Sequence, residues 1–173
     1  MQVCIQSPEA KVHAFSTSED LLHHATSGVA QVFRYWDRVR GDRVMPSAAD
    51  IDFMALRPWL PGLMVIEVTD RERRTLTYRV VGERAVRQRG YDPTGLTVDK
   101  AGFGRSIPAI LSNYGLVIDR KIPLYGCNNR NGGDPGLFPT GTLLLPLSDD
   151  GETVDRVLVY VEDSAAFDRH LAR

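Results

Sequence analysis

Apolar and polar positions alternate in short segments of the chain, and five of these segments are predicted to be strands. In residues 76–81, Leu76 and Tyr78 alternate with Thr77 and Arg79, which is the period of two expected of a strand with one buried face. Apolar runs of similar length predict further strands at residues 63–68, 122–127, 142–147 and 154–161. The last two are joined by a segment whose Asp-Gly step favours a hairpin turn.

A spacing of three and four residues predicts a long helix over residues 16–41. Ser16 and Glu19 have the form of a capping box, and Gly41 suits the C-terminal end. The apolar positions of this helix follow a heptad-like seam: Leu22, Ala25, Val29, Val32, Trp36 and Val39. Two explanations of the seam remain open, because the helix can pack on its own sheet or pair with the same helix of a second chain. In the second case these six residues form the interface of a homodimer.

Three shorter helices are expected. One runs from Asp50 or Asp52 to Arg57 and is closed by Pro58 and Pro61. A polar turn of helix is expected over residues 83–89, and a longer helix begins near residue 107. The apolar face of that longer helix includes Ile107, Ile110, Leu111, Tyr114, Val117 and Ile118. Of these, Tyr114 alone carries a polar atom, so its hydroxyl needs a partner if it is buried.

The order of these elements predicts an α+β fold. It consists of a five-stranded antiparallel sheet with helices on one face, preceded by the long N-terminal helix. Residues 1–15 show no sustained period and are predicted to be a flexible tail. The domain itself is expected over residues 42–163, and residues 164–173 are expected to form a C-terminal cap.

The segment that follows the strand at 76–81 carries a recognisable motif. Tyr78, Arg79, Val81 and Gly82 are followed by Gly90, Asp92, Thr94 and Gly95. This pattern resembles the middle of a PAS domain, in the branch of small bacterial single-PAS proteins, and the resemblance covers roughly residues 35–162. The lead-in of that family usually reads Arg-x-Asp-Ile-Asp-Pro. Ala48 and Phe53 depart from it here, which weakens any role assigned to an arginine at that point.

The resemblance implies a ligand pocket between the sheet and the helix near Tyr114. The candidate lining residues are Tyr78, Phe103, Ile110, Tyr114 and Leu124, although each of them can equally be an ordinary core residue. A haem PAS domain needs an axial ligand, usually histidine, and no histidine lies between His24 and His170. Cys127 lies at a strand end, away from the helix position of a flavin-linked cysteine. We therefore expect no metal and no covalent cofactor, and a small molecule held by non-covalent contacts.

Composition narrows the classes of partner and compartment. The 173 residues include 21 basic and 22 acidic side chains, so the formal net charge of −1 favours neither nucleic acid nor anionic membranes as a partner. Two cysteines are too few for a disulfide framework. No apolar run approaches the ~20 residues that span a bilayer, and no signal peptide is recognised, so a cytoplasmic location is expected.

Three functions remain after this survey. The first is a small-molecule-sensing PAS module that signals through self-association or through a signalling protein partner. The second is an adapter that binds no small molecule and fills its interior with its own side chains. The third is a small cone-shaped α+β enzyme, which needs buried acid–base residues, and the sequence singles out no buried His-Asp pair. We therefore expect a sensor that is not an enzyme.

Overall fold

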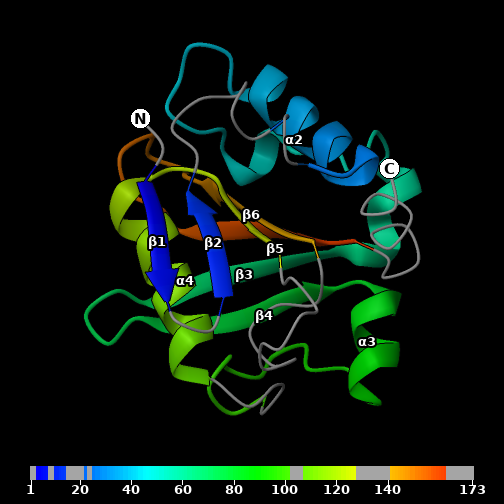
Figure 1. The fold of residues 1–173 in the computed structure, drawn as a ribbon, viewed down its shortest axis with the longest axis vertical. Helices are drawn as coiled ribbons and strands as arrows, with labels where there is room; N and C mark the ends of the chain where they lie inside the picture. The colour runs from blue at the N-terminus through cyan, green and yellow to red at the C-terminus, as the bar shows by residue number, and fades with distance from the viewer. Residues whose placement is uncertain are drawn as a thin grey trace.

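The computed structural model describes residues 3–7, 10–14, 22, 25–101, 107–127 and 141–162. Its helices are α2 (Ser27–Arg40), α3 (Glu83–Arg89) and α4 (Ile107–Arg120), with two 3-10 helices, η1 (Ala48–Asp50) and η2 (Arg57–Gly62). Its strands are β1 (Val3–Ser7), β2 (Ala10–Ala14), β3 (Leu63–Asp70), β4 (Thr75–Val81), β5 (Leu124–Cys127), β6 (Thr142–Leu147) and β7 (Arg156–Val161). Together they form one antiparallel sheet in the order β1-β2-β5-β6-β7-β3-β4 (Figure 1).

The five predicted strands are β3 to β7, and they form a contiguous antiparallel block, which confirms the predicted α+β fold class. The prediction of a flexible tail over residues 1–15 is wrong, because β1 and β2 form a hairpin in this part of the chain. This hairpin pairs with β5 from Leu124 to Cys127 and lengthens the sheet on that side. Each of its strands has only five residues, so the alternation is too short to stand out in the sequence.

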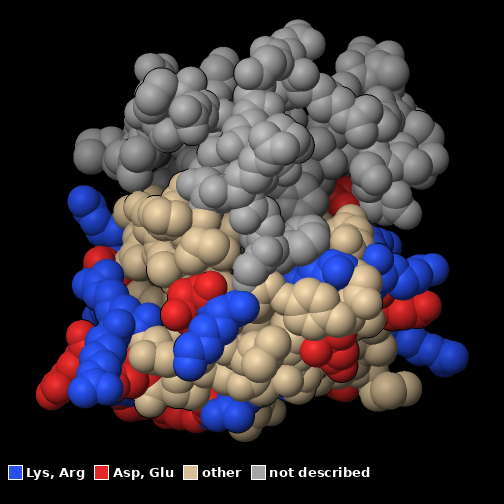
Figure 2. All heavy atoms as spheres, turned by 90° about the horizontal axis from the view of Figure 1, so that it is seen from below, with Lys and Arg blue, Asp and Glu red and all other residues tan. Residues whose placement is uncertain are grey.

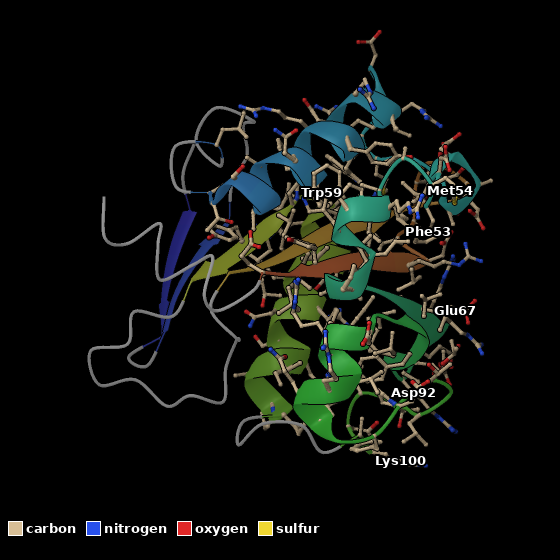
Figure 3. The ribbon with its side chains drawn as sticks, turned by 90° about the vertical axis from the view of Figure 1, so that its right-hand side faces the viewer. Phe53, Met54, Trp59, Glu67, Asp92 and Lys100 are labelled. Carbon is tan, nitrogen blue, oxygen red and sulfur yellow. The ribbon has the colours of Figure 1, made fainter. Side chains whose placement is uncertain are left out.

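The central strands are covered on both faces. Every residue of β6 is buried, and so are residues 157–161 of β7. Helix α2 lies on one face of the sheet, and α3 and α4 lie on the other (Figures 1 and 3). The helices that follow β4 therefore share one face as predicted, and the N-terminal helix forms a third layer on the opposite face.

Helix α2 begins at Ser27, which corrects the continuous helix predicted from residue 16. Thr26 is its N-cap, with extended backbone and a side-chain Oγ1 that accepts from the Val29 amide at 3.4 Å. A cap at this position ends any helix that approaches from the N-terminal side. The predicted C-terminal end at Gly41 is confirmed, and this glycine has a positive φ of 57°. The capping box of Ser16 and Glu19 lies outside the described residues.

The apolar seam of α2 packs on the sheet of its own chain. Val29, Val32 and Trp36 are at most 2% exposed in the single chain, and Ala25 is also buried. The Trp36 indole Nε1 donates to the Pro146 carbonyl oxygen in β6 at 3.0 Å. Packing within the chain accounts for these positions, since a second chain has no access to them while α2 stays on the sheet. The remaining seam residues, Leu22 and Val39, are half-buried against the core.

The short helix predicted from Asp50 or Asp52 to Arg57 is also corrected. The structure has η1 and η2 instead, and both Pro58 and Pro61 lie inside η2. Proline is compatible with this helix because its fixed φ suits a 3-10 turn, and a first-turn residue such as Pro58 has no intrahelical acceptor for an N–H. Helix η2 contacts α3 and β7, and Figure 3 labels its Trp59. The predicted C-terminal cap, residues 164–173, lies outside the described residues.

Gly82 fixes the path of the chain where β4 meets η2. A Cβ at this position would lie 2.5 Å from the Leu60 carbonyl oxygen, 2.6 Å from that of Pro61 and 2.7 Å from that of Leu63. The Gly82 amide also donates to the Leu63 carbonyl at 2.7 Å, so the two segments cannot separate without losing this bond. The space at Gly82 is therefore closed by backbone atoms, which cannot rotate away.

We predict that Gly82→Ala lowers the free energy of unfolding by about 2 kcal/mol, because the added methyl group overpacks this crossing. The matched control is Gly115→Ala in α4, whose Cβ would meet only the Arg74 Nη1 at 3.2 Å. The control should raise stability by up to ~1 kcal/mol, since glycine inside a helix is unfavourable relative to alanine. Chemical denaturation measures both variants, and a Gly82→Ala protein as stable as the parent would contradict the crossing described here.

Candidate functional site

The outer edge of β4 is fixed by the loop that follows α3. The Gly95 amide donates to the Tyr78 carbonyl at 2.8 Å, and the Tyr78 amide donates to the Leu96 carbonyl at 3.0 Å. Two residues earlier in β4, the Leu76 carbonyl accepts from the Val98 amide at 2.8 Å. The loop thus acts as a partner for an edge that would otherwise be unpaired. As a result, the backbone of Tyr78 is held on this side by two hydrogen bonds.

The residues of the Gly-x-Asp-x-Thr-Gly motif build this loop. Gly90 ends α3 in the left-handed region with φ of 78°, and Gly95 has φ of 86°. Between them, Asp92 Oδ1 accepts from the Thr94 amide at 3.0 Å and from the Thr94 hydroxyl at 2.7 Å. Figure 3 places Asp92 in this loop, on the α3 side of the sheet. The motif therefore has a structural explanation: it shapes the loop that holds β4.

Tyr78 lies on the face of the sheet that α4 covers. On β7, Tyr160 lies near Gly28 and Glu162 bonds to Thr26, so these two side chains face α2. The neighbouring positions of the strand face the other way, toward α4, and Val157 is one of them. Val157 pairs with Ile66, and Ile66 pairs with Tyr78, so the same face continues across three strands.

An arginine joins Tyr78 in this interior. Tyr78 is 4% exposed, and its hydroxyl accepts from the Arg89 Nη2 at 2.9 Å. Arg89 comes from the last turn of α3, and its guanidinium carbon lies 5.2 Å from the centroid of the Tyr78 ring. Burial raises the pKa of Tyr78 above its ordinary value, and the positive charge of Arg89 opposes that rise. A cationic group is thus placed beside a buried phenol.

Helix α4 adds two polar side chains to the same region. Its buried residues are Asn113, Tyr114 and Val117, which form the side that faces the sheet. Burial raises the pKa of Tyr114 far above that of a free phenol, Tyr78 raises it further and Arg89 lowers it. Tyr78 and Arg89 are in direct contact, and Asn113 and Tyr114 are neighbouring buried residues of α4. We call Tyr78, Arg89, Asn113 and Tyr114 the α4-side cluster.

Asn113 is the least satisfied member of the α4-side cluster. The residue is 9% exposed, and its Nδ2 is buried without a hydrogen-bond partner among the described residues. Leaving a buried amide donor unpaired costs on the order of 1–3 kcal/mol, so native proteins rarely contain one without a reason. A bound molecule or an ordered water would remove this cost.

The predicted lining residues are partly brought together. Tyr78 and Tyr114 belong to the α4-side cluster. Leu124 is fully buried and pairs with Leu144, whose partner Val159 faces α4, so Leu124 lies on the same face of the sheet. Ile110 is half-buried against the core on α4. Phe103 lies outside the described residues.

Sequence reasoning missed Arg89 and Asn113. Arg89 belongs to a polar helix with several arginines, and nothing in the pattern marks it as the one that points inward. Asn113 had a weak signal, because a polar residue directly precedes Tyr114 on the apolar side of a helix. Its burial depends on how α4 is rotated over the sheet, and helical periodicity does not resolve that rotation to one residue.

A second buried polar group lies on the α2 side of the sheet. Glu162, 6% exposed, accepts from the Thr26 hydroxyl at 2.6 Å and from the Tyr160 hydroxyl at 3.0 Å. A Cβ on Gly28 would lie 2.4 Å from the Glu162 carboxylate, so glycine is needed for this close approach. Burial, together with the adjacent Glu162 carboxylate, raises the pKa of Tyr160. These contacts fasten the start of α2 to the end of β7.

Other classes of site find no support in the described part of the chain. Within those residues, no three His, Cys, Asp or Glu side chains lie together as a metal site would require. The helices described there are too short or too polar to cross a bilayer. Figure 2 shows the face seen from below, where Lys and Arg are interspersed with Asp and Glu over the described residues. That face presents no large patch of a single charge.

Comparison with known proteins identifies the family. The profile of the PAS domain family matches residues 23–161, and the chain belongs to this family. PAS domains are sensory and signalling modules, and this general description applies to the chain. A solved structure described as an RNA-binding Light-Oxygen-Voltage receptor is 18% identical with a TM-score of 0.44, and the match covers 73% of this chain and 39% of that one. A search of curated proteins finds no match.

The burial of Tyr114 generates a prediction at alkaline pH. Its pKa is raised in the folded state, so above about pH 10 the unfolded chain loses a proton that the folded chain retains. The stabilisation is therefore fully present below pH 10 and declines as the pH rises. Each such tyrosine lowers the unfolding free energy by about 1.4 kcal/mol per pH unit in this range.

In the Tyr114→Phe variant, the unfolding free energy should fall less steeply than in the parent between pH 10.5 and 12. The expected difference in slope is about 1.4 kcal/mol per pH unit, the contribution of one tyrosine. Between pH 7 and 9, the difference in stability between the variant and the parent should stay constant. Denaturant unfolding at a series of pH values measures both slopes. Parallel curves above pH 10 would mean that Tyr114 ionises as an exposed phenol does.

Proposed function

We propose that this protein is a PAS module that senses a small molecule bound non-covalently beside the α4-side cluster. The observation that carries the proposal is the buried Asn113 Nδ2, which has no acceptor among the described residues. Asn113 belongs to the helix that covers the sheet and directly precedes the buried Tyr114. A concave, mostly apolar interior with a few convergent polar groups is the usual setting of a small-molecule site.

The signal is proposed to leave through the α2 side of the sheet, to a second copy of the chain or to another signalling protein. Strands β6 and β7 are buried on both faces, so they contact both helical layers at once. A ligand shifts the balance between two states only by binding one of them better. A ligand-dependent shift of α4 would change the packing of β6 and β7, on which α2 lies. The start of α2 is held there by the hydrogen bond from the Thr26 hydroxyl to Glu162.

The adapter function is kept as the second candidate because Tyr78 and Arg89 already bond to each other. A tyrosine–arginine pair that is already hydrogen-bonded needs no guest. In that case the interior is simply the core of the domain, and the protein acts through its surface. The two candidates differ in whether a small molecule occupies the α4 side.

Native mass spectrometry of the purified protein tests the proposal directly. We expect a fraction of the chain to carry an added small mass that disappears under denaturing conditions. The same sample should gain thermal stability with at least one member of a library of neutral, anionic and cationic metabolites. A clean mass of the chain alone, combined with no stabilisation by any library member, would refute the sensor and favour the adapter.

A further inference from the structure

The two edges of the sheet differ in how they are protected. On β4, the backbone groups of Leu76 and Tyr78 already bond to the loop that follows α3. The pairing of β3 with β4 also contains two register shifts, and such irregularities are a common protection of a sheet edge. A strand of another molecule that approaches β4 therefore finds these backbone groups occupied.

The other edge, β1, has none of these protections. It is the outermost strand of the sheet, and no described segment pairs with its outer side (Figure 1). Its residues pair with β2 in a continuous register from Val3 to Ser7, so the edge is regular. Its sequence, Val-Cys-Ile-Gln-Ser, contains no charged residue and no proline, which are the residues that usually prevent an exposed edge from pairing.

The backbone groups of β1 that point outward follow from its pairing with β2. Ser7 pairs with Ala10 across a loop of two residues, and the closing residues of such a tight hairpin exchange hydrogen bonds. Hydrogen-bonded pairs alternate along an antiparallel ladder, so the residues between them, Cys4 and Gln6, direct their N–H and C=O groups away from β2. These two residues offer two donors and two acceptors to a further strand.

We propose that β1 pairs antiparallel with β1 of a second copy of the chain, with the two-fold axis at Ile5. In this register, Cys4 of each copy lies opposite Gln6 of the other, and every outward N–H and C=O group of both strands gains a partner. An identical strand supplies the matching pattern and brings no charge that would oppose the contact. Because the β4 edge is occupied, the pairing stops at two chains.

The proposed contact is small. Strands of five residues bury little surface, so we expect a weak dimer with a Kd of about 10–500 μM. This interface does not depend on the proposed small-molecule site. The dimer is expected in the chain with and without a bound molecule, so either proposal can fail while the other stands.

Sedimentation equilibrium of the full chain, from about 5 μM to 1 mM, should show a reversible change from monomer to dimer. Gln6→Pro removes an outward N–H that the hairpin itself does not use, and proline is tolerated at such an edge position. We expect this variant to associate at least tenfold more weakly than the parent. Gln6→Ala is the matched control, because it loses the same side chain but keeps the N–H, and it should associate as the parent does.

A cross-linking experiment tests the register without depending on a proline variant. In a chain that carries Cys4→Ser and Cys127→Ser, Ile5→Cys should form a disulfide-linked dimer under mild oxidation. Residues directly opposite each other at a non-hydrogen-bonded position have Cα atoms about 4.5 Å apart, which a disulfide can bridge. Val3→Cys in the same background is the control, since its two copies would lie about 14 Å apart and should not cross-link.

Three results would overturn this interface. The first is a monomer at every concentration. The second is a dimer that Gln6→Pro leaves unchanged or that cross-links equally through Val3→Cys and Ile5→Cys, because the second copy then docks elsewhere. The third is an assembly that grows beyond two chains with concentration, because the β4 edge would then not be closed.

Discussion

The burial of β6 and β7 on both faces is the constraint on which the rest of the structure depends. A strand with apolar side chains on both sides cannot leave either side in water, so it requires a layer of helix above and below. Helix α4 covers one side, and α2 covers the other. The polar groups of each layer are then enclosed where the helices meet the sheet. Both the α4-side cluster and the Glu162 contacts follow from this arrangement.

The two buried polar groups differ in the way that matters for function. On the α2 side, Glu162 is bonded to Thr26 and Tyr160, so the group fixes the position of a helix. On the α4 side, Tyr78 and Arg89 bond to each other, but the Asn113 amide has no acceptor among the described residues. Evolution tolerates such a cost most readily at sites that bind something. This contrast is the reason why we propose a ligand on one side of the sheet and a structural role in holding α2 on the other.

The sequence predicted the middle of the fold well, because each strand there has its own clear signal. Alternation or an apolar run marks β3 to β7, and the glycines around Asp92 mark the loop beside β4. The start of α2 was misplaced because the heptad spacing runs on through Leu22 and Ala25, while the cap at Thr26 overrides it. The hairpin of β1 and β2 was missed because its strands are short and depend on pairing with the edge of β5.

The candidate site was predictable only in part, for a related reason. Tyr78 and Tyr114 were found because each is an aromatic residue in a clear apolar pattern. Arg89 and Asn113 were missed because their burial depends on the packing of α3 and α4 on the sheet, which no local pattern encodes. The apolar seam of α2 illustrates the same limit. Its spacing fits a second chain as well as the sheet, and the burial of Val29 and Trp36 within the chain accounts for it.

A high-resolution crystal structure of the protein as purified tests the central claim most directly. The claim predicts density for a small molecule between α4 and β4, with an acceptor atom about 2.9 Å from the Asn113 Nδ2. Well-ordered side chains that fill this region completely, with the Asn113 amide bonded to a protein acceptor, would contradict it.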